Sequence, residues 1–345
     1  MKILIIGGTL FLGRHLVEAA LAGGHKVTLF NRGTTNPGLF PDVEHLHGDR
    51  DTDLAALSGR SWDAAIDTCG YVPRIVQKSA EFLARAIGLY VYVSSASVYA
   101  DLNRDRIDES APLNTLDDAT TENVAENYGA LKAMCEGAVQ STMPGRALIA
   151  RAGLLVGPYD QTERFMYWVQ RVKAGGEVLA PGKPGRRIQL IHARDMADWI
   201  VRMIESNRIG IYNVAGPASP LTMGELLEAC RQATGSDAAF TWVAEAFLGE
   251  RKVAPFSEMP LWLPEDSNGL LSLDLAKAIA DGLSFRTLAE TIADTMAWDK
   301  QRLLSGGMKP ARLASGAATH AGISRERERE FLNAWHTRPG VAARA

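Results

Sequence analysis

The stretch that decides the fold is Met1-Lys-Ile-Leu-Ile-Ile-Gly-Gly-Thr-Leu-Phe-Leu-Gly-Arg14. Residues 3–6 form an apolar, β-branched run, which is typical of a strand buried on both faces of a parallel sheet. The run ends at Gly7-Gly8, and a helical pattern of apolar residues starts near Gly13. A glycine turn between a strand and a helix lets the backbone approach a pyrophosphate, whose charge the helix N-terminus stabilises. The stretch therefore predicts a dinucleotide-binding βαβ unit.

The spacing of the glycines leaves a second interpretation open. The pattern G-x-G-x-x-G would need glycine at Thr9 and Leu12, and G-x-x-G-x-x-G fits Gly7 and Gly13 but meets Leu10 in the middle. Glycines between a strand and a helix also occur for packing reasons alone. On the dinucleotide interpretation, the residues of the turn expected to contact the cofactor are Gly7, Thr9, Leu10, Phe11, Leu12 and Gly13.

The second predicted strand, residues 26–30, bears on the choice of cofactor. It is followed by Asn31-Arg32-Gly33, with no carboxylate. In dinucleotide-binding folds an acidic residue here binds the ribose 2′-OH of NAD, whereas an arginine accommodates the 2′-phosphate of NADP. Arg32 therefore favours NADP over NAD, although a solvated loop arginine would give the same sequence. Asn31, Asp49 and Thr68 are also expected at the cofactor site, with Asp49 near the adenine.

The order of predicted elements gives the fold class. Further strands are expected at residues 43–47, 62–67 and 89–93, with an amphipathic helix at 73–87. Alternating strands and helices predict a Rossmann-type, doubly wound parallel sheet of the α/β class, followed by a smaller mixed α/β substrate region. We expect the dinucleotide-binding domain at 1–155, with 188–215 returning to it, a substrate-binding region at 156–304, and a tail at 305–345. The tail is expected to contain a short charged helix.

The bulk composition excludes several classes of protein. The chain has 345 residues, 46% of them hydrophobic, and a net charge of −3, so it has a sizeable core and no basic excess that would indicate a nucleic-acid partner. Its three cysteines are scattered without metal-ligand spacing, and no metal site is predicted. No apolar run approaches the ~20 residues of a membrane span, and the N-terminus does not look like a secretory signal. We expect a cytoplasmic protein that acts on a small molecule.

Two polar segments lie where such a sheet would place a reactive centre. The fifth strand is followed by Ser94-Ser95-Ala96-Ser97, at the carboxyl end where the cofactor crevice is expected. A long helix from about residue 121 to 142 carries Tyr128 and Lys132, which share one face because they are four residues apart. A nearby ammonium group lowers the pKa of a phenol and makes it a plausible base, but a surface Tyr–Lys pair would look the same.

Taken together, these motifs resemble the extended short-chain dehydrogenase/reductase superfamily, in its NAD-dependent epimerase/dehydratase group. The resemblance covers roughly residues 1–300, and its turn is most similar to a branch of isoflavone-reductase-like proteins and uncharacterised epimerases. A plant branch with a similar turn includes chloroplast RNA-binding proteins. The segments that carry the resemblance are Gly7–Gly13, Val91–Tyr99, Tyr128–Lys132, Arg151–Pro158, Gln189–Ala197 and Gly210–Gly216.

The resemblance implies a catalytic set and an activity. Ser95 would hold the reacting oxygen, Tyr128 would be the acid/base, and Lys132 would bind the nicotinamide ribose and lower the Tyr128 pKa. Ser94 would contact the cofactor. The implied function is an NAD(P)-dependent reductase or epimerase that transfers hydride at a carbinol or carbonyl carbon. The alternative is a non-catalytic dinucleotide-binding regulatory or RNA-binding protein.

The sequence departs from the family pattern at several positions. Leu10 replaces a turn glycine, and Arg32 replaces the acidic residue of NAD-retaining epimerases. Ala96 and Ser97 occupy the positions where sugar-nucleotide dehydratases carry Asp-Glu, which argues against water elimination.

On the substrate side, the family implies a small molecule, such as a sugar or nucleotide sugar, and a homodimer formed through the Tyr128 helix and its predecessor. The residues expected near substrate are Ser97, Arg164 and Arg187. Arg164, Arg186 and Arg187 could each pair with an anionic group, but the simpler interpretation is that they are ordinary solvated arginines.

Overall fold

The computed structural model describes residues 1–304 and 321–338 of the chain. Its framework is a seven-stranded parallel sheet in the order β3-β2-β1-β4-β5-β6-β11. The doubly wound α/β fold predicted from the sequence is therefore confirmed. The strands are β1 (Lys2–Ile6), β2 (Lys26–Asn31), β3 (Glu44–His47), β4 (Trp62–Asp67), β5 (Ile87–Ser95), β6 (Ala147–Ala152) and β11 (Gly210–Val214).

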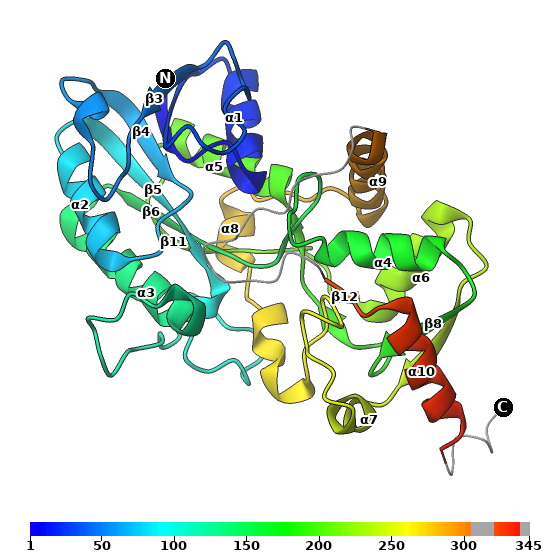
Figure 1. Cartoon of the computed structure of the whole chain (residues 1–345). Helices are drawn as coiled ribbons and strands as arrows, with labels where there is room; N and C mark the ends of the chain where they lie inside the picture. The colour runs from blue at the N-terminus through cyan, green and yellow to red at the C-terminus, as the bar shows by residue number, and fades with distance from the viewer. Residues whose placement is uncertain (305–320, 339–345) are drawn as a thin grey trace.

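Helices cover both faces of this sheet. Helices α1 (Phe11–Ala22) and α5 (Ala193–Glu205) pack together on one face, and α2 (Pro73–Leu83) and α3 (Val124–Thr142) on the other (Figure 1). Successive residues of β1 alternate between the two cores: Ile3 and Ile5 face α1 and α5, whereas Leu4 and Ile6 face α2. The first strand is apolar throughout because both of its faces are buried.

Several element boundaries differ from the sequence-based expectation, and those of α2 and β5 bear on the site. Helix α2 ends at Leu83 and not at residue 87, because the chain turns there to enter β5 at Ile87. Strand β5 in turn extends to Ser95, where 93 was expected. The polar residues Ser94 and Ser95 are therefore held by the sheet itself, and only the segment from Ala96 onward, the short 3₁₀ turn η2 (Ala96–Val98), leaves it.

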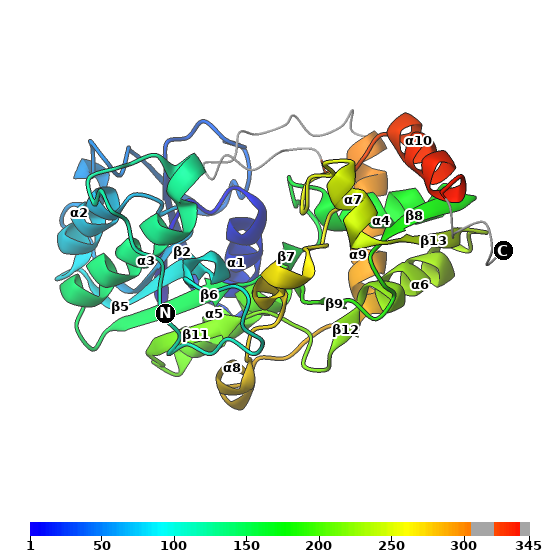
Figure 2. The same ribbon diagram turned by 90° about the horizontal axis from the view of Figure 1, so that it is seen from below.

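Apart from α5, β11 and residues 276–280, which pack with the sheet, most of the second half of the chain forms a smaller mixed lobe beside it (Figure 2). It contains three short strand pairs, β7–β10, β9–β12 and β8–β13, of which β9–β12 is antiparallel. The strands are β7 (Leu155–Val156), β8 (Glu177–Pro181), β9 (Arg187–Ile188), β10 (Ile191–His192), β12 (Leu221–Thr222) and β13 (Ala239–Val243). The other helices of this half are α4 (Arg164–Lys173), α6 (Met223–Thr234), α7 (Glu245–Glu250), α8 (Ala276–Ala280), α9 (Leu288–Leu304) and α10 (Arg325–His336). Two 3₁₀ turns complete the set: η1 (Ala55–Leu57) in the first half of the chain and η3 (Glu265–Leu271) in the second.

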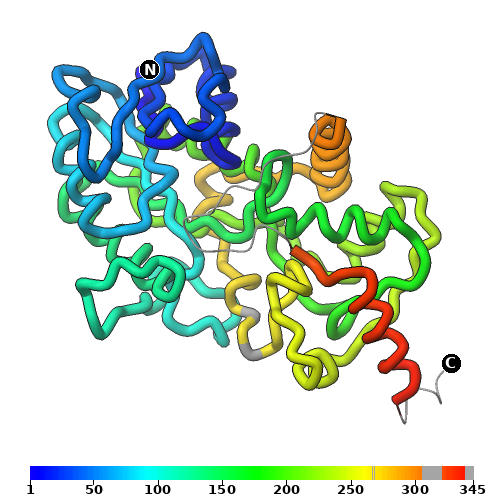
Figure 3. Tube along the Cα trace, in the orientation of Figure 1, coloured from blue at the N-terminus to red at the C-terminus, as the bar shows by residue number. Residues whose placement is uncertain are grey.

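Local sequence signals explain two of these helices. Thr222 and Glu225 form a reciprocal capping box at the start of α6, as the Thr-x-x-Glu pattern predicts. Helix α10 packs on the second lobe (Figure 3) by burying Phe331 and Leu332, and its Glu328 pairs with Arg171 at 2.7 Å. The other parts of the predicted tail, 305–320 and 339–345, lie outside the described residues.

Within residues 1–304 and 321–338, no helix combines the length and the apolar character that crossing a bilayer requires. Cys69, Cys135 and Cys230 are all free thiols.

Candidate functional site

A cavity of about 970 Å³ opens at the carboxyl ends of the strands and extends toward the second lobe. It is where ligands bind in open α/β sheets. The cavity brings together most of the residues singled out from the sequence, although they come from seven different segments of the chain. Those in its wall are Gly7, Thr9, Leu10, Phe11, Leu12, Gly13, Asn31, Arg32, Asp49, Thr68, Ser94, Ser95, Tyr128, Lys132 and Arg164.

The glycine turn is shaped as a cradle. Gly7 and Gly8 have φ angles of +103° and +89°, which side chains other than glycine rarely adopt. A Cβ atom on Gly13 would lie 2.8 Å from the Cα of Gly8, so this glycine is required for α1 to approach the turn. Leu10 has an extended backbone (φ −125°, ψ 151°) that any residue tolerates, and no side chain caps the helix that follows. The missing middle glycine therefore leaves the turn intact, and the first N–H groups of α1 lack a side-chain acceptor.

The end of β2 is fastened to this turn. Asn31 donates from Nδ2 to the carbonyl of Gly7 at 3.0 Å and accepts the N–H of Gly33 at 2.9 Å. Arg32 is exposed, lines the cavity, and forms no ion pair within the described part of the chain. Its guanidinium is thus available to a ligand at this end of the cavity.

A buried ion pair that the sequence analysis missed lies under the same region. Arg50 reaches both carboxylate oxygens of Asp67 at 2.7 Å, and Asp67 also accepts the hydroxyl of Tyr90 at 2.9 Å. Burial would raise the pKa of Asp67, but the Arg50 guanidinium outweighs it and holds that pKa below its ordinary value. Arg50 lines the cavity, so the pair fixes a planar cation in its wall.

Ser95 and Tyr128 meet because two segments approach unusually closely. A Cβ atom on Gly129 would lie 2.1 Å from the carbonyl oxygen of Ser97, so only glycine lets α3 pack on η2. This contact places Tyr128 beside Ser95 at the end of β5. Burial raises the pKa of Tyr128, and a hydrogen bond with Ser95 acts in the opposite direction.

Lys132 is held by backbone carbonyls at the wall of the cavity. Its Nζ donates to the carbonyls of Gly70 at 2.9 Å and Val93 at 2.6 Å, and it lies 4.1 Å from the ring centroid of Tyr92. Burial lowers the Lys132 pKa to about 8. The lowering of the Tyr128 pKa by Lys132, which the resemblance implies, stays a prediction.

Not every predicted substrate residue reaches the cavity. Arg187 pairs with Asp105 at 3.1 Å and also contacts Ser272, and Arg186 donates to the carbonyl of Leu263 at 2.7 Å. Ser97 lies just behind Ser95, whose Oγ it contacts at 3.2 Å. The structure thus places Ser97, Arg186 and Arg187 outside the cavity wall, because each is occupied in holding neighbouring segments together.

Comparison with known proteins now identifies the chain's relatives. The model of the NAD dependent epimerase/dehydratase family matches residues 74–215. Over this segment the chain is similar to the NAD-dependent epimerase/dehydratase family. It is 27% identical over 343 residues to the chloroplast stem-loop binding protein of 41 kDa b of Arabidopsis thaliana, covering 88% of this chain and 85% of that protein. It is also 27% identical over 280 residues to the bovine epimerase family protein SDR39U1, covering 75% of this chain and 90% of that protein.

Solved structures of the same fold support the architecture. The Bacillus cereus UDP-glucuronic acid 4-epimerase in complex with NAD matches with a TM-score of 0.64 and 16% identity, over 87% of this chain and 99% of that one. The Bordetella bronchiseptica enzyme WbmH in complex with NAD+ matches with a TM-score of 0.64 and 17% identity, over 87% and 98%. At these identities the likeness establishes the fold alone.

The family's dinucleotide fits the residues present. The turn around Gly7, Gly8 and Gly13 has the close-packed backbone that a pyrophosphate cradle needs, and a Cβ atom on Gly13 would disrupt it. The helix that follows offers N–H groups to an anion. Residues that would hold the adenosine end, Asn31, Arg32 and Asp49, and those at the reactive end, Ser95, Tyr128 and Lys132, line one continuous cavity.

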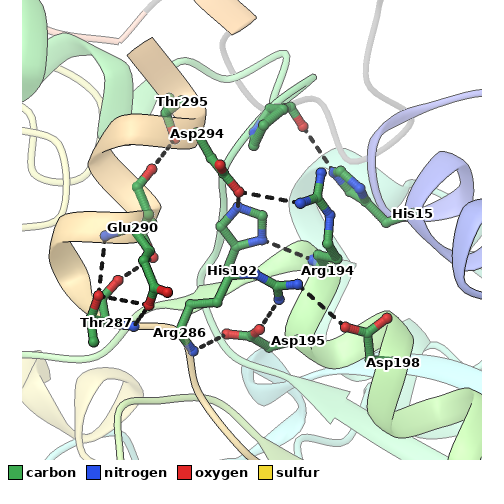
Figure 4. A network of polar contacts seen from close by, with 12 residues as sticks. His15, His192, Arg194, Asp195, Asp198, Arg286, Thr287, Glu290, Asp294 and Thr295 are labelled. Atoms are coloured by element: carbon green, nitrogen blue, oxygen red, sulfur yellow. Dashed lines mark hydrogen bonds and ion pairs between the residues drawn. The ribbon is translucent and has the colours of Figure 1, made fainter. Parts of the chain in front are cut away.

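A polar network behind the cavity joins the two lobes (Figure 4). His192 begins α5 and accepts the N–H of Arg194 on Nδ1 at 3.0 Å, and its Nε2 lies 3.6 Å from Asp294 of α9. Arg286 pairs with Asp195 of α5. Burial and the nearby His15, Arg286 and Arg194 lower the His192 pKa to about 3, so this imidazole is neutral and has a structural role.

Proposed function

We propose that the chain is an NAD(P)-dependent reductase or epimerase that transfers hydride at a carbinol or carbonyl carbon. The observation that supports the proposal most strongly is that Ser95, Tyr128 and Lys132 line the same cavity as the glycine turn. The similarity to this family supports the same chemistry, and Ala96 and Ser97 lack the carboxylates that water elimination would use there.

Each residue of the set has a definite task in this proposal. The Ser95 hydroxyl donates a hydrogen bond to the substrate oxygen, and the Tyr128 phenol gives that oxygen its proton in reduction or removes it in oxidation. Lys132 holds a cofactor ribose hydroxyl. Once its ammonium group turns toward the ligand, this cation in a low-dielectric wall also favours the phenolate form of Tyr128. A bound nicotinamide dinucleotide would supply or accept the hydride.

The preferred cofactor in this proposal is NADP(H). Arg32 is exposed at the adenosine end of the cavity and has no carboxylate partner in the described residues, so it is free to bind a 2′-phosphate. Arg32→Gln should weaken NADPH binding at least tenfold and leave NADH binding nearly unchanged. An equal loss of affinity for NADPH and NADH would contradict the proposed preference for NADP(H).

The experiment for the activity combines cofactor identification with turnover. The purified protein is denatured, any released dinucleotide is identified, and carbonyl compounds are screened with NADPH and NADH. Tyr128→Phe should lower kcat at least 100-fold without changing dinucleotide affinity, because it removes only the proton-transferring hydroxyl. Unchanged turnover by this variant would exclude Tyr128 as the acid/base.

A second function is favoured by one observation. A relative similar over 88% of this chain is a stem-loop binding protein, so a non-catalytic RNA-binding role is the alternative. The net charge of −3 provides no general basic excess for phosphate binding. Stem-loop RNA that binds with submicromolar affinity, together with no turnover on any carbonyl compound, would favour this alternative.

A further inference from the structure

The cavity has a polar wall that the proposed reaction leaves without a role. The segment from Gly157 to α4 contributes Asp160, Gln161, Thr162 and Arg164 to the same cavity as Tyr128. Asp160 and Gln161 are buried, with exposed fractions of only 5% and 9%. Of these four residues, only Arg164 was selected from the sequence.

Asp160 differs from the other buried carboxylates of the described chain. Its Oδ1 accepts the N–H of Thr162 at 2.8 Å and the hydroxyl of Thr162 at 2.7 Å, and no described residue donates to its Oδ2. It has no ion pair with any described cation, and burial raises its pKa to about 6 against the opposing Thr162 bonds. Each of the other buried carboxylates pairs with an arginine: Asp67, Glu136, Asp195, Asp299 and Glu328.

The matching cation is Arg164, the first residue of α4, four residues after Asp160 in the sequence. Its Nε donates to the carbonyl of Phe256 at 3.2 Å and its guanidinium lies 5.0 Å from the Phe256 ring centroid, which fixes the side chain. It forms no ion pair with a described carboxylate, and burial lowers its pKa while the charge of Asp160 acts in the opposite direction. Asp160 and Arg164 are thus held apart, and both face the cavity.

We propose that Asp160 and Arg164 form a two-point recognition site for the substrate, in which Asp160 accepts hydroxyl groups and Arg164 binds an anionic group. A buried carboxylate is costly unless donors satisfy it, and substrate hydroxyls supply them on binding. A guanidinium binds phosphate and carboxylate alike. The inference rests on the proposed function, and it assigns the substrate to hydroxylated carbonyl compounds that carry an anionic group.

A series of six-carbon ketones tests this class. Fructose 6-phosphate and 5-ketogluconate carry hydroxyls and an anion, fructose carries hydroxyls only, and cyclohexanone carries neither. Each is titrated calorimetrically into protein saturated with the oxidised dinucleotide, which cannot reduce the ketone, and the absorbance at 340 nm is followed to verify that no alcohol is oxidised. One or both anionic ketoses should bind at least tenfold more tightly than fructose, and the stronger of the two identifies phosphate or carboxylate as the anion. Failure of both to bind, or equal binding of cyclohexanone, would overturn the assignment.

Two variants and one control separate the roles of the charges. Asp160→Asn should weaken binding of the anionic ketose with the higher affinity at least tenfold. The amide oxygen can still accept the hydrogen bonds from Thr162, but the negative charge is lost. Arg164→Gln should reduce the affinity for this ketose to that of fructose. Asp118→Asn is the control, because Asp118 makes the same turn with Thr120 on an exposed loop away from the cavity.

Failure of this inference can be told apart from failure of the proposed function. Dinucleotide affinity should stay unchanged in all three variants. If the wild type binds no dinucleotide, the proposed function fails. If it binds dinucleotide and depends on Tyr128, but Asp160→Asn and Arg164→Gln bind the ketoses like wild type, only the recognition site is wrong.

Discussion

At the scale of single residues, the Arg50–Asp67 pair makes the sharpest stability prediction. Asp67 is fully buried, and Asp67→Asn would leave the Arg50 guanidinium in the cavity wall without its counter-charge. Breaking a buried pair in this way costs about 3–5 kcal/mol, which chemical denaturation would report. Asp51→Asn is the control, since its pair with Arg74 is largely exposed and its removal should change stability little.

The same pair gives a pH dependence whose sign is fixed. The pKa of Asp67 is lower in the folded chain than its ordinary value of about 3.9. The ionised Asp67 therefore contributes fully to the free energy of unfolding when the pH is above its ordinary pKa. This contribution is lost as the pH falls through the pKa of Asp67 in the folded chain. Wild type should lose more stability than Asp67→Asn on acidification below about pH 4, and a parallel loss in both proteins would contradict the assignment.

Candidate site residues can be selected from the sequence where a motif is local. The glycine turn, Arg32, and the pair Tyr128 and Lys132 can be selected because their spacing carries meaning within a few residues. Arg50 and Asp160 cannot be selected in this way. The role of Arg50 depends on Asp67, 17 residues away at the end of β4, and that of Asp160 depends on a cavity assembled from distant segments.

At the scale of elements, α3 provides a matched pair of glycines. Gly129 packs on the carbonyl of Ser97, whereas a Cβ atom on Gly137 would meet nothing within 4 Å. Gly129→Ala should push α3 away from η2, separate Tyr128 from Ser95, and lower both thermal stability and kcat. Gly137→Ala should raise stability by about 0.5–1 kcal/mol through helix propensity alone. Equal behaviour of the two variants in melting and turnover would show that the close approach is unimportant.

The strands and helices themselves were easier to predict than the residues at which they begin and end. The alternating strands and helices gave the parallel sheet, because each pattern is set by local periodicity. The extension of β5 to Ser95 was not predicted, since it depends on pairing with β6. Neither the end of α2 at Leu83 nor the break at Asn127 was predicted; at Asn127, φ −121° and ψ 25° depart from helix one residue before Tyr128.

At the scale of the whole molecule, the two lobes are joined by a network that contains a neutral histidine. The His192 pKa is about 3 when folded and about 6.5 in an unfolded chain, so the unfolded state binds more protons between these values. Stability should therefore fall as the pH decreases from about 6.5 toward 3. His192→Asn, which can still cap α5, should show a smaller fall between pH 7.5 and 5 in urea unfolding. His47→Asn, on the surface, should behave like wild type.

The central claim is that the cavity binds a nicotinamide dinucleotide through the glycine turn, and equilibrium titration tests it most directly. NADPH and NADH are titrated fluorimetrically into wild type and Gly13→Ala, with circular dichroism melts to verify the fold. The account predicts saturable binding to wild type and at least tenfold weaker binding to Gly13→Ala, whose added Cβ would meet the Gly8 backbone at 2.8 Å. A folded wild-type protein that binds neither dinucleotide would contradict it.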